Sequence, residues 1–447
     1  MGLRFYFGGS GAGKSRQLHE NILSMGKREP EKNFLMLVPD QFTMQTQVDL
    51  VKASDCGGIM NIDVLSFGRL AHRIFEETGY DSKPVLDDTG KSLVLRRVAS
   101  DLKEKMPVIG KNLNKIGYIH EVKSALSEFM QYGIDVGQVG ELAEFAKGRG
   151  TLYYKLKDLK MIYQGFQEYI QDRFITTEET LELLTGAVGK SEIIRNSVIA
   201  FDGFTGFTPI QYRLIRELMR LTDEVIVSIT IDIREDPLKT RGEQELFYLS
   251  KKTVTDLCRL ARETNVERRE DVFIRNIPLP RFSDSKMLAH LEQNLFRTGQ
   301  TRYTGELKDQ KQLRIVGFPR PVEELRFAAG EIRRLVREGY RYQDIAIVSG
   351  DVEMFASYVQ QVFSEYEIPY FLDQTNPILF HPLIECVRGF LEMAKRDFSY
   401  DSVMRVLKSG LLPIETEQAD LLENYVLAYG ICGRSSWSRR RVPSPPC

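Results

Sequence analysis

Short apolar runs alternate with longer segments of helical periodicity along most of the chain. The runs that we expect to form strands comprise residues 4–7, 34–38, 62–66, 198–201, 225–230, 313–317 and 345–348. Strands that alternate with helices are typical of parallel α/β sheets. The pattern therefore predicts an α/β fold.

One part of the chain breaks this alternation. Between about residues 90 and 189 the strand-like runs vanish, and helical stretches such as 118–132 take their place. Because a guest segment can be inserted into an α/β domain, the strands on either side can share one sheet. We therefore expect a first α/β domain formed by residues 1–93 and 190–300, interrupted by a helical insertion at 94–189.

The last third of the chain is expected to form a separate unit. A polar, proline-punctuated stretch leads to a second α/β unit over residues 310–430, which begins with the run at 313–317 and a helix at 322–338. Residues 431–447 carry the single tryptophan, three successive arginines and three prolines without periodicity. That composition favours a disordered tail or a non-native extension.

Composition and charge limit the kinds of binding partner and the cellular compartment that we expect for this protein. The 447 residues include 61 Lys and Arg and 62 Asp and Glu, so any nucleic-acid binding must use local patches. The five cysteines lack the spacing of a metal site or a disulfide framework; they are Cys56, Cys258, Cys386, Cys432 and Cys447. No apolar stretch is long enough to span a bilayer, and no export signal is recognisable. We therefore expect a cytoplasmic protein without a membrane partner.

A glycine-rich segment directly follows the first expected strand and opens a helix-period run at 16–25. It matches the pattern Gly-x4-Gly-Lys-Ser and comprises Gly8, Gly9, Ser10, Gly11, Ala12, Gly13, Lys14 and Ser15. Its glycines allow backbone N–H groups to point at phosphates, Lys14 can neutralise the β/γ charge, and Ser15 can ligate Mg²⁺. The sequence therefore predicts a phosphate-binding loop for ATP with Mg²⁺.

Hydrolysis would require more than this loop. In P-loop hydrolases one carboxylate at a strand end holds Mg²⁺ and a second carboxylate positions the attacking water. Asp202 follows the apolar run at 198–201 and suits the first role beside Ser15, with a turn or helix-capping role as the alternative. The next residue is Gly203, so the water-positioning acid is missing and we assign no catalytic residue.

The surroundings of Asp202 resemble a motif of superfamily 1 DNA helicases, in which Asp-Glu-x-Gln-Asp is followed by Pro-x-Gln. The spacing is kept, but Gly203, Thr205 and Gly206 replace the Glu, the Gln and the second Asp. Other segments are similar to further helicase motifs in the same order, namely 37–42, 64–70, 345–351, 368–372 and 381–384. The motor resembles one that has lost its hydrolytic chemistry.

The phosphate loop, the strand end at 202–211 and the altered second motor together resemble the AddB family, over residues 1 to about 430. The resemblance implies a RecA-like, superfamily 1 helicase-like domain with a helical insertion, followed by part of a second RecA-like domain. It implies a non-translocating subunit that pairs with an AddA-type helicase–nuclease at single- and double-stranded DNA ends. Such a heterodimer processes double-strand breaks for recombinational repair, and this subunit helps to recognise Chi.

The same resemblance implies parts that are absent here. The family carries a C-terminal nuclease domain with a 4Fe-4S cluster, and the clustered cysteines that would hold the cluster are not found in this sequence. We therefore expect an N-terminal fragment without nuclease chemistry.

In helicases of this kind the loops after the second and third strands line the single-stranded DNA path. The resemblance therefore implies DNA contacts from Gln41, Thr43, Phe67 and Arg69. Phe67 can stack on a base and Arg69 can bind a phosphate. Core packing is the alternative for Phe67.

Two other functions stay open on the residues alone. A P-loop kinase or other small-molecule phosphotransferase would use Asp202 or Asp40 on its acceptor, although the inserted helices argue against it. A scaffold with a relic nucleotide site is the other, because Gly203 predicts weak or absent turnover. Whether the chain is an enzyme is therefore left open.

Overall fold

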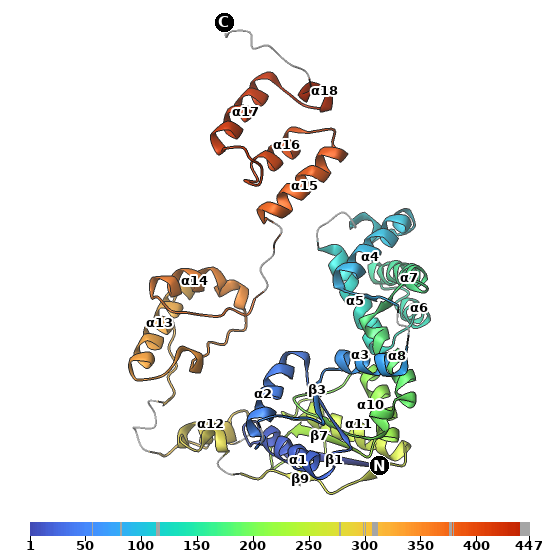
Figure 1. Ribbon diagram of the computed structural model, residues 1–447, viewed down its shortest axis with the longest axis vertical. Helices are drawn as coiled ribbons and strands as arrows, with labels where there is room; N and C mark the ends of the chain where they lie inside the picture. Colours follow the sequence, from blue (N-terminus) through green and yellow to red (C-terminus); the bar gives the residue numbers. More distant parts are fainter. Residues whose placement is uncertain are drawn as a thin grey trace. The chain divides into compact units, whose positions relative to one another are not determined.

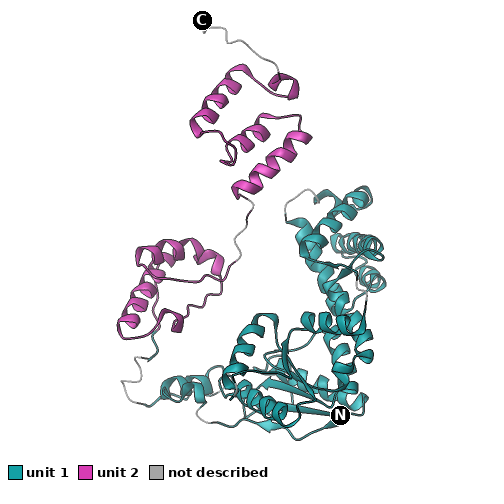
Figure 2. Cartoon of the chain, viewed as in Figure 1, with its two compact units in different colours: residues 1–314 teal, residues 315–447 magenta. Residues whose placement is uncertain are grey.

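The computed structural model describes the chain (Figure 1) except residues 56, 81–82, 113–116, 277–278, 298, 300, 306–311, 375–377, 379 and 439–447. It divides into two compact units, Met1–Arg314 and Ile315–Cys447 (Figure 2). Among the described residues every strand belongs to the first unit. No helix of the described chain combines the length and the apolar character needed to cross a membrane.

A parallel sheet organises the first unit. Its strands are β1 (Gly2–Gly8), β2 (Asn33–Leu37), β3 (Ile62–Leu65), β6 (Ser197–Phe201), β7 (Glu224–Thr230), β8 (Glu267–Arg268) and β9 (Val272–Phe273). The order is β3-β2-β6-β7-β1-β8, with β9 also on β1, and all these pairs are parallel. The α/β fold is confirmed, as are the strands predicted at 4–7, 34–38, 62–66, 198–201 and 225–230.

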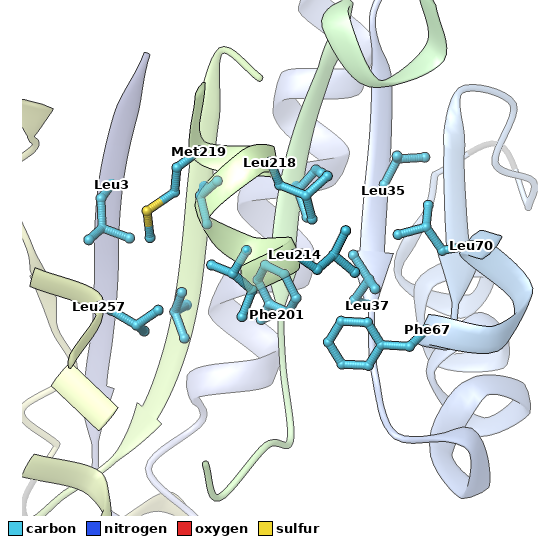
Figure 3. Close-up of a cluster of buried hydrophobic side chains, with 14 of the residues drawn as sticks. Leu3, Leu35, Leu37, Phe67, Leu70, Phe201, Leu214, Leu218, Met219 and Leu257 are labelled. Atoms are coloured by element: carbon cyan, nitrogen blue, oxygen red, sulfur yellow. The ribbon is translucent and has the colours of Figure 1, made fainter. Parts of the chain in front are cut away.

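Alternating side chains bury both faces of this sheet. Leu3, Phe5 and Phe7 of β1 pack with α3 (Phe67–Thr78), α10 (Pro209–Leu221) and α11 (Tyr248–Glu263), as Figure 3 shows in part. Tyr6 lies on the other face with α1 (Lys14–Arg28) and α2 (Thr43–Ala53). This period of two with apolar residues on both sides is what a parallel sheet covered by helices requires.

A helical block lies in the chain between α3 and β6. It contains β4 (Val85–Leu86), α4 (Asp88–Leu102), η2 (Lys103–Lys105), η3 (Gly110–Asn112), α5 (Tyr118–Tyr132), α6 (Val136–Phe145), α7 (Thr151–Ile170), β5 (Ile175–Thr176), α8 (Thr177–Ala187), η4 (Val188–Lys190) and α9 (Glu192–Arg195). Strands β4 and β5 pair only with each other. The block has its own hydrophobic cluster, with Leu95, Val122 and Phe166 among its members. The predicted insertion, residues 94–189, falls within this block.

The second unit is helical where it is described. Its helices are α13 (Pro321–Arg337), η7 (Tyr342–Asp344), α14 (Val352–Glu365), α15 (Pro382–Lys395), α16 (Tyr400–Leu407), α17 (Thr416–Tyr429) and α18 (Arg434–Trp437). Leu325, Ala329 and Ile332 of α13 pack with Val359, Val362 and Phe363 of α14. The helix predicted at 322–338 is confirmed as α13.

Two strand predictions are wrong in this region. Residues 313–317 and 345–348 belong to no ladder among the described residues, and Ile315 and Val348 are 95% and 93% exposed. An apolar run becomes a strand only when a neighbouring strand accepts its hydrogen bonds. These two runs therefore have the composition of strands without the pairing.

The first part of the segment predicted as a disordered or non-native tail, from residue 431, packs against helices of the second unit. Ile431 is buried with Met404 and Val426. The indole Nε1–H of Trp437 donates a 3.1 Å hydrogen bond to the carbonyl of Phe398. Residues 439–447, with the three arginines, lie outside the described residues.

Candidate functional site

The carboxyl edge of the main sheet gathers the predicted site residues. The phosphate loop follows β1, η1 (Asp40–Phe42) lies just beyond β2, and Asp202 follows β6. Parallel strands end at one edge, where α/β proteins place their ligands. Only β7 separates β1 from β6, so Asp202 and the loop lie at the same part of this edge.

The loop between β1 and α1 depends on two glycines. Gly11 and Gly13 have φ values of 85° and 95°, a left-handed conformation that a Cβ disfavours. The amide of Ala12 donates to the carbonyl of Gly9 at 3.2 Å and closes the turn. Helix α1 then begins at Lys14, so its free N–H groups and positive dipole end are available to an anion.

Lys14 is buried within this loop. Its Nζ donates to the carbonyl of Gly9 at 3.0 Å, and its side chain is held where the helix begins. Burial lowers the pKa of Lys14, the charge of Asp202 raises it, and that of Arg281 lowers it again. A desolvated ammonium group that faces one carboxylate favours a polyanionic ligand. Ser15 is the next helical residue and is exposed.

Asp202 fits a metal-binding role better than a capping role. It is 6% exposed, and its Oδ1 has no hydrogen-bond partner among the described residues. A buried carboxylate oxygen without a partner is costly, and Mg²⁺ takes such oxygens together with phosphate oxygens and water. Groups of three or more His, Cys, Asp or Glu suited to a metal are absent from the described residues.

The backbone of Gly203 has a conformation that favours glycine. Its φ is +78°, and a Cβ placed there would lie 3.5 Å from Pro39 Cδ and 3.7 Å from Phe42 Cδ2. The space would accept a Cβ, but the left-handed conformation disfavours any side chain. The position that holds Glu in the helicase motif is thus a glycine with a left-handed backbone conformation.

Two other acids near the sheet, Glu224 and Asp232, are paired with arginines. Glu224 begins β7 at the opposite edge and pairs with Arg4 at 2.9 Å and Arg269 at 2.8 Å. Asp232 pairs with Arg234 and Arg297, each at 2.6 Å. Although burial opposes it, hydrogen bonding from Arg234 lowers the pKa of Asp232 to about 2. Both carboxylates are thus paired with arginine side chains.

The predicted DNA-contacting residues divide into two pairs. Gln41 and Arg69 are exposed beyond β2 and β3. Thr43 is 6% exposed, and its hydroxyl donates to the carbonyl of Asp40 at 2.9 Å. Phe67 is 8% exposed, and Figure 3 shows its ring directed toward the buried cluster that contains Phe201.

The packing of Phe67 favours the core alternative. Its ring centroid lies 6.1 Å from that of Phe201 and 5.6 Å from that of Phe204. A base can stack only on a ring face that solvent reaches. DNA contact by Gln41, Thr43, Phe67 and Arg69 stays a prediction.

The loop after β2 contains an exposed aromatic residue, Phe42, that was not predicted to contact DNA. Phe42 is 45% exposed and borders Gly203. The available signal was its position between Gln41 and Thr43, in the loop already expected to contact DNA. Phe42 differs from Phe67 in its solvent exposure. A turn of three residues is too short for sequence periodicity to predict which of its side chains are exposed.

Comparison with known proteins identifies the family of the chain. The family model described as "ADDB, N-terminal" matches residues 5–292. A protein of Lachnoclostridium phytofermentans, named as a subunit of an ATP-dependent helicase/deoxyribonuclease, is 41% identical over 98% of this chain and 39% of its own length. Proteins of the same name from Acetivibrio thermocellus and Desulforudis audaxviator are 34% and 33% identical over 98% of this chain. The chain spans 37% to 39% of the length of these relatives. Because the family model covers more than half of the chain, the protein belongs to the AddB family.

Proposed function

We propose that this chain holds ATP and single-stranded DNA as part of one subunit of an ATP-dependent helicase/deoxyribonuclease. The observation that carries the proposal is that Lys14 and Asp202 are both buried at the phosphate loop and interact through their charges, with Gly203 in place of a second acid. The names of the relatives support the helicase and deoxyribonuclease setting. On this proposal the nucleotide is bound and not turned over by the chain alone.

Each part of the site has a separate role in holding ATP. The backbone of residues 8–13 offers N–H groups to the phosphates, and Lys14 neutralises their charge. Ser15 and Asp202 hold the Mg²⁺ that accompanies the nucleotide. Gly203 supplies no second carboxylate to orient or deprotonate an attacking water.

The family suggests a partner and a DNA substrate for the whole protein. We propose that the complete subunit pairs with an AddA-type helicase–nuclease and acts at double-strand DNA ends in recombinational repair, where it helps to recognise Chi. Its motor is helicase-like and does not translocate. In this chain the exposed residues of the β2 and β3 loops, Gln41, Phe42 and Arg69, contact the single strand.

Replacing Phe42 and Arg69 by alanine should weaken binding of a short single-stranded oligonucleotide. Loss of a stacking face costs about 1 to 3 kcal/mol per base. Loss of one phosphate contact lowers the slope of log affinity against log salt by about 0.7. Fluorescence anisotropy at several salt concentrations measures both effects.

The matched control for this experiment is Arg73→Ala. Arg73 lies one turn further along α3 and is paired with Asp63 at 2.5 Å, so its removal should leave the salt slope unchanged. Tight binding that is insensitive to Phe42→Ala and Arg69→Ala would place the DNA path elsewhere.

Restoring the acid by Gly203→Glu should not restore ATP hydrolysis. The left-handed backbone costs a residue with a Cβ about 1 to 2 kcal/mol, and relaxing it would move the carboxylate out of line with Asp202. We expect phosphate release by wild type and variant to stay at background in a steady-state assay.

Gly206→Ala controls for the loss of a glycine in the same loop. Gly206 is outside the left-handed region, and a Cβ there meets Thr253 Oγ1 at an ordinary 3.5 Å. Turnover that appears in Gly203→Glu and disappears again when Asp202→Asn is added would show that one acid is all the site lacks.

A further inference from the structure

A segment distant in sequence lies directly against the phosphate loop. The side-chain amide of Asn276 donates to the carbonyl of Ala12 at 3.2 Å. The backbone amide of Arg281, in η5 (Pro280–Phe282), donates to the carbonyl of Gly11 at 3.4 Å. These contacts lie within the first unit and hold Asn276 and Arg281, which precede α12 (Lys286–Asn294), against the loop.

The side chain of Arg281 starts directly beside Gly11 of the loop. A Cβ built on Gly11 would lie 2.8 Å from Arg281 Cβ and 3.2 Å from its Cδ and Nε. Gly11 therefore leaves the space that the start of this side chain occupies. Any larger residue at position 11 would push the arginine away.

Arg281 is exposed, and it has no carboxylate partner among the residues that the structure describes. Its neighbours beyond β7 differ in this respect, because Arg234 and Arg297 both pair with Asp232. An arginine fixed by its backbone, with a free guanidinium group, retains all its donors for a ligand.

The charges around the loop point to the kind of ligand. Lys14 and Arg281 repel each other across the loop, and Asp202 is the carboxylate that acts on Lys14. Two cations held together beside free helical N–H groups are stabilised when a polyanion lies between them. The planar guanidinium group matches phosphate oxygens in pairs, which a lysine does not.

We propose that Arg281 is a second cationic contact for the phosphates of the bound nucleotide, supplied from the segment after β9. The inference rests on the proposed nucleotide site and adds a basis for its selectivity. Each further phosphate adds negative charge between Lys14 and Arg281, so the site prefers triphosphate over diphosphate and diphosphate over monophosphate. Arg281 acts in binding, and no bond-breaking step is assigned to it.

The test is calorimetric titration of the purified chain with ATP, ADP and AMP in the presence of Mg²⁺. In Arg281→Ala the affinity for ATP should fall about tenfold or more, the scale of a lost charge-assisted contact. The loss should be smaller for ADP and smallest for AMP. Arg281→Lys should recover part of the ATP affinity, because it returns the charge without the paired donors.

The matched control is Arg259→Ala on α11. Arg259 is exposed but is paired with Asp256 of its own helix at 2.8 Å, so its removal lowers the net charge equally without touching the loop. All three affinities should be unchanged.

Other outcomes overturn the inference in distinguishable ways. Unchanged or tighter ATP binding in Arg281→Ala, with binding still lost in Lys14→Ala, rejects Arg281 and leaves the nucleotide site standing. An equal loss for ATP, ADP and AMP shows that Arg281 supports the loop and does not sense phosphate charge. Absence of ATP binding by the wild-type chain rejects both proposals.

Discussion

Replacing Lys14 by alanine should abolish ATP binding and leave the fold intact. Lys14 is the buried cation of the phosphate loop, and its Nζ donates a 3.0 Å hydrogen bond to the carbonyl of Gly9. Loss of a charge-assisted contact to two phosphates corresponds to about a hundredfold in affinity, or about 2.7 kcal/mol. Calorimetric titration with ATP and Mg²⁺ measures the loss.

The fold should survive because the charge of Lys14 does not stabilise it. Burial lowers the pKa of Lys14, so the folded state binds this proton less tightly than the unfolded chain does. The penalty is present at neutral pH, where the ammonium group is charged, and disappears as the pH rises above its ordinary pKa. Removing the charge therefore relieves an unfavourable term, and the melting temperature should not fall.

Lys27→Ala is the control for this experiment. Lys27 lies in the last turn of the same helix, is 54% exposed and pairs with Asp55 at 2.5 Å. Its removal should change neither ATP affinity nor melting temperature appreciably. ATP binding by Lys14→Ala within threefold of wild type would support the scaffold alternative, in which the loop is a relic.

The parts of the fold that were predictable are those whose signal is local. The run before Gly8 is buried on both faces, and the glycines after it can serve only a turn of unusual backbone conformation. Strand, loop and helix were therefore predictable together. The helix at Tyr118–Tyr132 was likewise marked by its own periodicity.

The parts that failed depend on partners that periodicity does not reveal. Residues 313–317 and 345–348 are apolar enough for strands. Whether such a segment forms a strand depends on a neighbouring strand that accepts and donates its backbone hydrogen bonds, and neither segment has one among the described residues. Trp437 was assigned to a tail because its segment, with three successive arginines and three prolines, shows no periodicity. In the structure its indole Nε1–H donates to the carbonyl of Phe398. Amino-acid composition indicates whether a segment can be buried, but it does not identify the residues that the segment contacts in the folded protein.

The candidate site shows the same division. Lys14 and Asp202 were found because a motif fixes their spacing from a strand end. Phe67 was predicted to contact DNA and Phe42 was not, although both lie in helicase-like segments and only Phe42 is exposed. Arg281 carries no motif, and its closeness to Gly11 exists only in the folded chain.

Replacing Lys91 by alanine should cause the largest loss of stability in the helical block. Its Nζ donates to both carboxylate oxygens of Glu178, at 3.0 and 2.8 Å, and the side chains are 3% and 8% exposed. The variant leaves Glu178 buried without a cation, which costs about 3 to 5 kcal/mol. Because the pair joins α4 to α8, hydrogen exchange of peptides from both helices should accelerate together.

Two variants separate charge from packing in this effect. Arg97→Ala removes an exposed pair on the same helix, 3.4 Å from Asp101, and should change stability by about 0.5 kcal/mol or less. Lys91→Met combined with Glu178→Leu removes both charges and keeps the volume, so it should recover most of the protection against exchange. If the double variant exchanges as fast as Lys91→Ala, the loss arises from packing between α4 and α8. Recovery would mean that Lys91 is needed mainly because Glu178 is buried opposite it.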